Sequence, residues 1–265
     1  MKTVRLLSVT DLHQARWMYD ALGNAVREHR PDILALGGDF LHAYDSTDIR
    51  LSPEECANRL AAFPCEVVFV RGNHEMENWQ AFVARWLDAR RIPHVPHGEA
   101  FVFGPLVLVV FPCTFGSAEH FLMGRADNSS KMKEWLPEIC RKHGPAARTL
   151  WLMHEPPAGT KLSEAEGLMA GVEEWREGIE DYQPWLTVSG HDHETPVFDG
   201  HWRDRIGQTI CLNFGQPARL THTTKTLHYG LFDFEFSGTE PQLPRRVTVT
   251  AYPWKKTFTV PEIQT

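Results

Sequence analysis

Several features that mark large classes of protein are missing from this sequence. Its best apolar run covers only residues 106–111, far short of the roughly 20 residues that cross a membrane as a helix, so we expect no membrane segment. Basic residues are not in excess, since 27 Lys and Arg stand against 34 Asp and Glu, the formal net charge is −7 and the pI is about 6.0. That balance argues against a broad basic surface, and extended binding of nucleic acid is not expected.

Cysteine is scarce and scattered. The chain has five cysteines and contains no C-x-x-C pair, so its spacing matches neither a zinc ribbon nor a disulfide framework. Residues 1–10 hold a short apolar stretch without the small-residue cleavage site of a signal peptide. We therefore expect a cytoplasmic protein whose thiols are reduced and mostly buried. The cysteines are Cys56, Cys65, Cys113, Cys140 and Cys211.

The chain has the size and composition of a globular enzyme. It is 265 residues long, with 42% hydrophobic and 23% charged residues, which is enough to bury a sizeable core. No internal repeat, low-complexity tract or linker divides it. We predict one domain over residues 1–265, with an α/β first part and a β-rich part from about residue 195.

Alternating strand and helix patterns predict β-α-β units in the first part. A strand, an amphipathic helix and a second strand are expected at 4–10, 16–29 and 33–36, and such a crossover connects parallel strands. Residues 100–103 and 106–111, joined by Gly-Pro, predict a hairpin. The other expected helices are 53–63, 77–91, 129–142 and 171–181, and the other expected strands are 66–70, 149–153, 185–189, 209–212, 227–236 and 246–252.

Short polar motifs follow the predicted strands as far as residue 193. Open α/β sheets bind ligands in the crevice at the carboxyl ends of their strands, so we expect these side chains to meet in one site. Asp39 could bridge two cations through its two carboxylate oxygens. Mixed nitrogen and oxygen donors suit Mn, Fe, Co, Ni or Zn. The motifs are Asp11-Leu12-His13, Gly38-Asp39, Gly72-Asn73-His74-Glu75, His154 and Gly190-His191-Asp192-His193.

This ordered set resembles the motifs of the calcineurin-like metallophosphoesterase superfamily, also called metallo-dependent phosphatases. The resemblance implies an α/β fold in which two mixed β-sheets form a sandwich flanked by helices. It places His74 where the family has its substrate-facing histidine, which could donate a proton to the leaving oxygen. It also implies one metal held by Asp11, His13, Asp39 and His193, and a second held by Asp39, Asn73, His154 and His191.

The implied activity is that of a dinuclear metal-dependent phosphoesterase. Two divalent cations roughly 3.5–4 Å apart can activate a water or hydroxide and polarise a phosphodiester or phosphomonoester. The expected substrate is a small phosphorylated molecule. Residues 154–157, His-Glu-Pro-Pro, resemble the His-Gly-Pro-Pro stretch of class III cyclic-nucleotide phosphodiesterases. Glu155, in place of the glycine, either alters that loop or crowds the pocket.

The segment after Asp39 departs from two subclasses. Ser/Thr protein phosphatases carry an Asp and an Arg shortly after the bridging Asp, and residues 40–44 contain neither. Purple acid phosphatases have a metal-binding Tyr three positions after it, where this chain has His42. His42 is either an outer contact of the site or a loop residue. Asp45 or Glu75 would have to replace the usual carboxylate partner of His74.

Alternatives to a small-molecule phosphoesterase stay open. A nuclease of the same fold should show a basic groove, which the acidic balance disfavours. A non-catalytic scaffold usually loses ligands, and every expected ligand is present. Residues 112–127 and 155–169 are long irregular segments that either border the substrate or connect elements at the surface. The sequence does not fix the substrate, the native metal or the oligomeric state.

Overall fold

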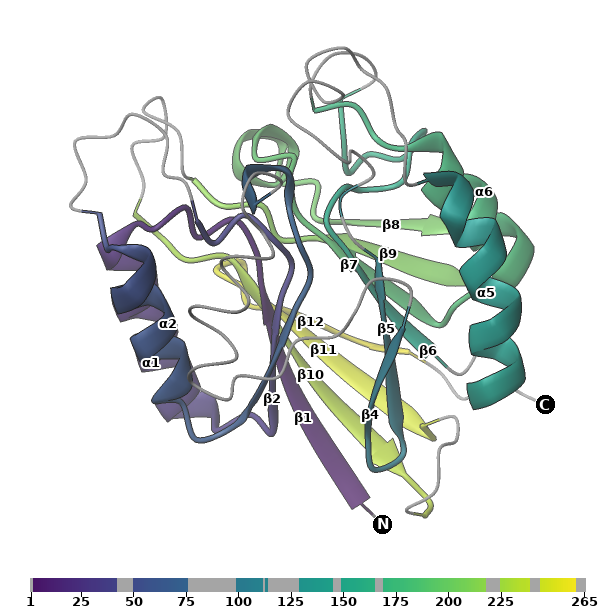
Figure 1. Ribbon diagram of the computed structural model, residues 1–265, viewed down its shortest axis with the longest axis horizontal. Helices are drawn as coiled ribbons and strands as arrows, with labels where there is room; N and C mark the ends of the chain where they lie inside the picture. The colour runs from purple at the N-terminus through teal and green to yellow at the C-terminus, as the bar shows by residue number, and fades with distance from the viewer. Residues whose placement is uncertain are drawn as a thin grey trace.

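The structure is a computed structural model of the chain. It describes residues 2–41, 50–75, 99–111, 113, 129–144, 149–164, 169–217, 225–238 and 244–260. Strands fill the middle of the molecule, and helices lie on two opposite sides of it (Figure 1). The helices are α1 (Arg16–His29), α2 (Pro53–Ala61), α5 (Ser129–His143) and α6 (Glu173–Tyr182), with a 3-10 turn η1 (Asn73–Glu75) and a π-helical turn η5 (Thr195–Asp199).

The first sheet has six strands in the order β12-β11-β10-β1-β2-β3. Strands β1, β2 and β3 are parallel, whereas β10, β11 and β12 continue the sheet in antiparallel pairs from β1 outward. The predicted β-α-β unit is confirmed, because α1 connects the parallel strands β1 and β2. The strands are β1 (Lys2–Val9), β2 (Ile33–Leu36), β3 (Glu66–Phe69), β10 (Tyr229–Phe236), β11 (Arg246–Tyr252) and β12 (Lys256–Val260).

The second sheet also has six strands, in the order β4-β5-β6-β7-β9-β8. Strands β5, β6, β7 and β9 are parallel, and β4 and β8 are antiparallel edge strands. The predicted hairpin is confirmed as β4 and β5, with Gly104 at a positive φ of 57° in the turn. The strands are β4 (Ala100–Phe103), β5 (Leu106–Phe111), β6 (Thr149–Met153), β7 (Leu186–Ser189), β8 (Arg203–Ile206) and β9 (Thr209–Asn213).

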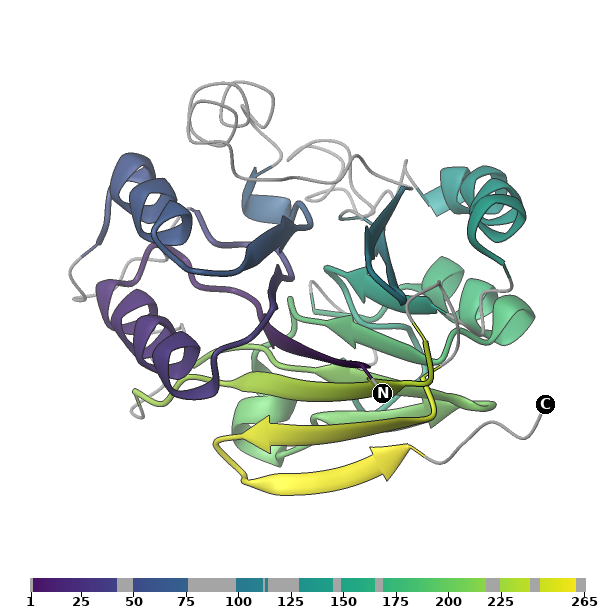
Figure 2. The same ribbon diagram turned by 90° about the horizontal axis from the view of Figure 1, so that it is seen from below.

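The two mixed sheets form a sandwich with helices outside, as expected from the sequence (Figure 2). Successive side chains of a strand point to opposite faces, so one strand serves two cores. In β1, Val4 and Leu6 lie in the core between the sheets, whereas Leu7 and Val9 pack in the core that includes α1 and α2. A third core joins the second sheet to α5 and α6. The parallel strands are therefore buried on both faces, which fits their continuous apolar sequences.

Aromatic rings from the two sheets meet around Trp202. Trp202 directly precedes β8 in the second sheet, and Trp254 lies in the turn between β11 and β12 of the first. Their rings stack with centroids 5.5 Å apart and planes 16° apart. Phe214 and Phe258 lie beside Trp202, with centroid distances of 6.4 and 6.1 Å. The sandwich is thus closed here by ring contacts between segments far apart in the sequence.

Most predicted elements are confirmed, with ends displaced by a few residues. Strands β8 and β12 were not predicted, because both are short, polar and partly exposed edge strands. Helix α2 ends at Ala61 rather than at residue 63, and the predicted helix 77–91 lies outside the described residues. Within the described part of the chain, no helix combines the length and apolar character needed to cross a membrane.

Candidate metal centre

The motifs lie in tight turns directly after strands, where their backbone takes an unusual conformation. Asp11, His13, Asp39 and His191 have positive φ angles of 54°, 42°, 51° and 65°. A non-glycine residue held there costs about 1–3 kcal/mol and persists only where surrounding contacts impose it. Backbone hydrogen bonds supply such contacts, since Asp11 N–H donates to Gly38 O at 2.9 Å and His13 N–H donates to Asp39 O at 2.8 Å. The turns after β1 and β2 therefore lock each other in place.

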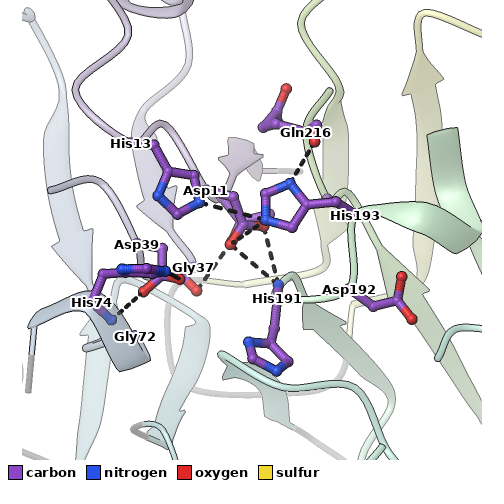
Figure 3. Close-up of polar contacts among 12 residues, drawn as sticks. Asp11, His13, Gly37, Asp39, Gly72, His74, His191, Asp192, His193 and Gln216 are labelled. Atoms are coloured by element: carbon purple, nitrogen blue, oxygen red, sulfur yellow. Dashed lines mark hydrogen bonds and ion pairs between the residues drawn. The ribbon is translucent and has the colours of Figure 1, made fainter. Parts of the chain in front are cut away.

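All seven predicted ligands meet at this place, together with His74. Figure 3 shows how His74 lies beside Asp11, His13, Asp39, His191 and His193. Three groups of His and Asp side chains each bring their donor atoms within 4.8 Å of one another. Two groups share Asp39, and two share His13. The groups are Asp11, His13 and His193; His13, Asp39 and His74; and Asp39, His154 and His191.

Asn73 completes the third group. Its side-chain oxygen lies 2.8 Å from His154 Nε2 and 2.9 Å from His191 Nδ1. Asn73 begins η1 after β3, whereas the two histidines follow β6 and β7. Three side chains from both sheets thus converge beside the Asp39 carboxylate, whose Oδ2 is 3.4 Å from His154 Nε2.

Backbone carbonyls fix how two of the imidazoles are oriented. His154 Nδ1 lies 2.9 Å from Gly37 O, and His193 Nδ1 lies 2.5 Å from Gln216 O. A carbonyl only accepts, so each Nδ1 carries the proton and each Nε2 is turned toward the centre. His193 Nε2 then faces His13 Nε2 at 3.5 Å. Nitrogen donors that converge in this way, held from behind by carbonyls, suit a cation.

Two glycines of the motifs are required by close approach. A Cβ atom on Gly72 would lie 2.1 Å from Asp39 Oδ1, and one on Gly190 would lie 2.5 Å from Asp11 Oδ2. Both distances are far below van der Waals contact. The Gly-Asn-His and Gly-His motifs therefore need glycine, because the Asp39 carboxylate beside Gly72, and the Thr10 side chain and Asp11 carboxylate beside Gly190, occupy the space that a side chain would fill.

Burial makes the charges of the centre interdependent. Burial alone would raise the pKa of Asp39, but the imidazoles of His154 and His74 hold that pKa well below the usual range of a carboxyl. Burial raises the pKa of Asp11 to about 8, against the opposing effect of His154. Burial alone would lower the pKa of His154, yet the Asp39 carboxylate raises it to about 10. Asp39 and His154 therefore form a buried ion pair, and Asp11 retains its proton near neutral pH.

His74 lies at the rim of the centre. Its side chain is 17% exposed, while that of Asp39 is 2% exposed, and Nε2 of His74 is 3.7 Å from Asp39 Oδ2. Its ring meets the ring of His13 edge to face, with centroids 4.9 Å apart. The His74 side chain is thus partly exposed to solvent and lies next to Asp39, the carboxylate that two of the groups share.

Two residues that stand inside the motifs, Glu75 and Asp192, support the centre through contacts that the motif pattern does not reveal. Glu75 is buried, and its carboxylate accepts backbone hydrogen bonds from Asp39, Leu41 and Gly72. Burial, with the nearby Asp39 carboxylate, raises the pKa of Glu75 to about 8. Asp192 accepts from the N–H groups of Glu164, Glu194 and Thr195 and so ties the loop after His154 to the loop that carries His191 and His193. These partners are distant in sequence or are backbone atoms, so spacing alone could not reveal them.

Glu155 is fully buried, and one of its oxygens accepts a hydrogen bond from Cys113 Sγ at 3.0 Å. Its carboxylate is thus engaged in the interior with the residue that follows β5. His42, Asp45 and nearly all of the segment 112–127 lie outside the described residues. Their predicted roles stay predictions.

Two mixed sheets in a sandwich, with Asp, His and Asn gathered beside the strand ends, define the metallophosphoesterase fold. The family model described as calcineurin-like phosphoesterase matches residues 4–195. The chain belongs to that family, as its motifs led us to expect. No curated protein matches the sequence.

Solved structures share the fold at low sequence identity. A dimetal phosphatase from Danio rerio is 12% identical with a TM-score of 0.63, over 98% of this chain and 99% of that one. A protein from Thermus thermophilus is 12% identical with a TM-score of 0.61, over 97% and 98% of the two chains. GAP50, the anchor in the inner membrane complex of Plasmodium, is 9% identical with a TM-score of 0.58, over 100% and 90%. At these identities the likeness concerns the fold alone.

Proposed function

We propose that this protein is a dinuclear metal-dependent phosphoesterase that hydrolyses a small phosphodiester or phosphomonoester. The observation that carries the proposal is the convergence of the predicted donors: Asp11, His13 and His193 form one group, Asp39, His154 and His191 form another, and a third group brings His13 and the buried Asp39 together beside His74. We assign one metal to Asp11, His13, Asp39 and His193, and the other to Asp39, Asn73, His154 and His191. Mn, Fe, Zn, Co and Ni all suit these nitrogen and oxygen donors.

Two divalent cations held there would supply positive charge, polarise a phosphoryl group and lower the pKa of bound water. The chain leaves much of that charge uncancelled, because Asp11 and Asp39 are the only anionic side chains among the assigned ligands. An anionic phosphate ester can therefore bind to a protein that is acidic overall. We assign to His74 the role of donating a proton from Nε2 to the leaving oxygen, and its partly exposed position 3.7 Å from Asp39 Oδ2 supports this role.

We also propose that residues 1–265 form one phosphoesterase domain in the cytoplasm. The β-rich end pairs with the first strand in a single sheet, since β10 lies beside β1. None of the five cysteines, all of which are among the described residues, forms a disulfide, which suits a reducing compartment. The substrate class, the metal and the number of subunits have to come from experiment.

The test compares metal-free and Mn-loaded protein on an aryl phosphodiester, and then on phosphomonoesters, cyclic nucleotides, dinucleoside polyphosphates and DNA. We expect hydrolysis only with metal and a preference for a small substrate. Asp39→Asn should abolish it, whereas Asp199→Asn, at an exposed position near the site in sequence, should not.

Equal turnover by Asp39→Asn under excess Mn would refute the assigned site. A preference for DNA would favour the nuclease alternative. Two bound metals without hydrolysis of any substrate would favour a scaffold of the same fold.

A further inference from the structure

Glu75 makes an unusual set of contacts for a buried acid. The residue is 1% exposed, and its two oxygens accept three backbone hydrogen bonds. Oε2 accepts from Asp39 N and from Gly72 N, each at 2.9 Å, and Oε1 accepts from Leu41 N at 2.9 Å. A buried acid is costly unless such donors compensate it, and here backbone N–H groups are arranged around both oxygens of Glu75.

These three contacts lie around Asp39, the ligand that the two metals would share, and beside Asn73, a ligand of the second metal. The N–H groups of Asp39 and Leu41 lie on both sides of the left-handed backbone at Asp39, where φ is 51°. Gly72 N–H belongs to the turn that delivers Asn73. In return, Asp39 Oδ1 accepts a hydrogen bond from His74 N at 2.9 Å. Glu75 holds the backbone of Asp39, and Asp39 holds the backbone beside Glu75, so the turns after β2 and β3 brace each other.

We propose that Glu75 is a positioning residue that aims the Asp39 carboxylate between the two metal positions. The inference rests on the proposed dinuclear site and names a residue that supports it from behind without touching the cations. Loss of the brace should free Asp39 to turn, so that its two oxygens no longer serve both metals.

The carboxylate is needed for its two acceptor oxygens. A glutamine keeps the length and shape but has only one oxygen. Its NH₂ group would therefore face either the N–H group of Leu41 or the N–H groups of Asp39 and Gly72, and would accept no hydrogen bond from them. Aspartate keeps both oxygens but is one methylene shorter. Glu75→Gln therefore removes the hydrogen bonds that one of the two oxygens accepts, and Glu75→Asp weakens the hydrogen bonds of both oxygens.

The experiment measures Mn binding by equilibrium dialysis and records the electron paramagnetic resonance spectrum of the loaded protein. Two Mn ions that share a bridging carboxylate give a spin-coupled spectrum, whereas separate ions give the six-line spectrum of isolated Mn. We expect the unchanged protein to bind two ions and show coupling. In Glu75→Gln the weaker ion should bind about 10–100-fold less tightly, as is typical when an outer contact of a metal site is lost, and the coupled spectrum should shrink.

The matched control is Glu66→Gln, the same change at an exposed position that begins β3, which should bind Mn and couple like the unchanged protein. Circular dichroism of the metal-free variants checks the fold, and Glu75→Asp takes the place of Glu75→Gln if the latter does not fold. Two Mn ions bound with unchanged affinity and coupling in Glu75→Gln would overturn the proposal, as would failure of both variants to fold. Failure of the unchanged protein to bind two ions would instead refute the proposed function.

Discussion

At the scale of single residues, two of the assigned metal ligands, Asp11 and His154, are expected to be protonated in the metal-free centre. A carboxylate ligand must be ionised and an imidazole ligand must offer a free lone pair. Burial raises the pKa of Asp11 to about 8, and the Asp39 carboxylate raises the pKa of His154 to about 10. At pH 7 both groups therefore hold a proton that metal binding has to remove.

Metal affinity should accordingly rise with pH. As the pH increases from 7 through 8, Asp11 loses its proton in the metal-free protein and no longer competes with the cation, and His154 follows at higher pH. Each proton released makes the affinity about tenfold greater per pH unit in its window. Calorimetric titration with Mn in buffers of different ionisation enthalpy measures the protons released. An affinity that stays constant between pH 7 and 8.5, with no dependence on the buffer, would contradict these assignments.

His74 offers a second test at this scale. If it protonates the leaving oxygen, His74→Ala should slow hydrolysis of alkyl phosphate esters by about 10²–10⁴-fold. Activated aryl esters need little protonation, so they should lose much less. Rates on both ester classes check this, with His201→Ala, at an exposed position, as the control. An equal loss on both classes would mean that His74 binds or orients the phosphate.

The sequence predicts ligands far better than it predicts their supports. Asp11, His13 and Asp39 stand in motifs whose order along the chain carries information, and the structure brings them together. Glu75 also stands in a motif, but two of its three partners are backbone N–H groups 34 and 36 residues away. Backbone donors have no sequence signature, so this contact is visible only once the turns are folded.

At the scale of elements, α2 shows how local sequence fixes a boundary. Ser52 accepts a hydrogen bond from Glu55 N–H at 3.1 Å, and Glu55 accepts one from Ser52 N–H at 2.7 Å. This is a capping box followed by proline at the first turn. Both the N-cap and the proline were recognisable in the sequence, and the start of the helix was predicted correctly.

Ser52→Ala should lower the free energy of unfolding by about 1 kcal/mol, the usual cost of losing such a cap. Metal binding should be unchanged, because the contacts that define the centre lie elsewhere. Urea unfolding of the metal-free protein measures the difference. Ser237→Ala, at an exposed position after β10, should leave it unaltered, and an equal loss in both variants would argue against the cap.

Edge strands were the hardest elements to predict. Strand β8 has the sequence Arg-Asp-Arg-Ile, and only Ile206 in it is buried. Its pairing with β9 comes from backbone hydrogen bonds, which do not require an apolar pattern. The central strands bury both faces and are obvious in the sequence, whereas an edge strand is defined by a neighbour that the sequence does not identify.

At the scale of the whole molecule, the centre lies where both sheets contribute side chains. His13 and Asp39 follow strands of the first sheet, and His154 and His191 follow strands of the second. Each of the two assigned metals would take ligands from both sheets, so a bound cation would resist separation of the sheets. Metal binding and global stability should be coupled.

Mn at about 100 times its dissociation constant should raise the free energy of unfolding by about 2.7 kcal/mol for each independent site. A chelator should abolish the gain. Thermal unfolding with and without Mn gives the measurement, and Asp39→Asn should lose most of the shift while Asp199→Asn keeps it. A melting temperature that does not respond to Mn in the unchanged protein would count against binding across the two sheets.

The stacked indoles of Trp202 and Trp254 give the sandwich an optical property of its own. Identical chromophores 5.5 Å apart share their excited states, and we expect paired circular dichroism bands of opposite sign if their transition moments are skewed. Trp202 lies next to a strand of the second sheet and Trp254 next to strands of the first, so this signal depends on the packing of the two sheets and not on the helices. These paired bands would therefore report on the contact between the two sheets, and Trp254→Phe should abolish them.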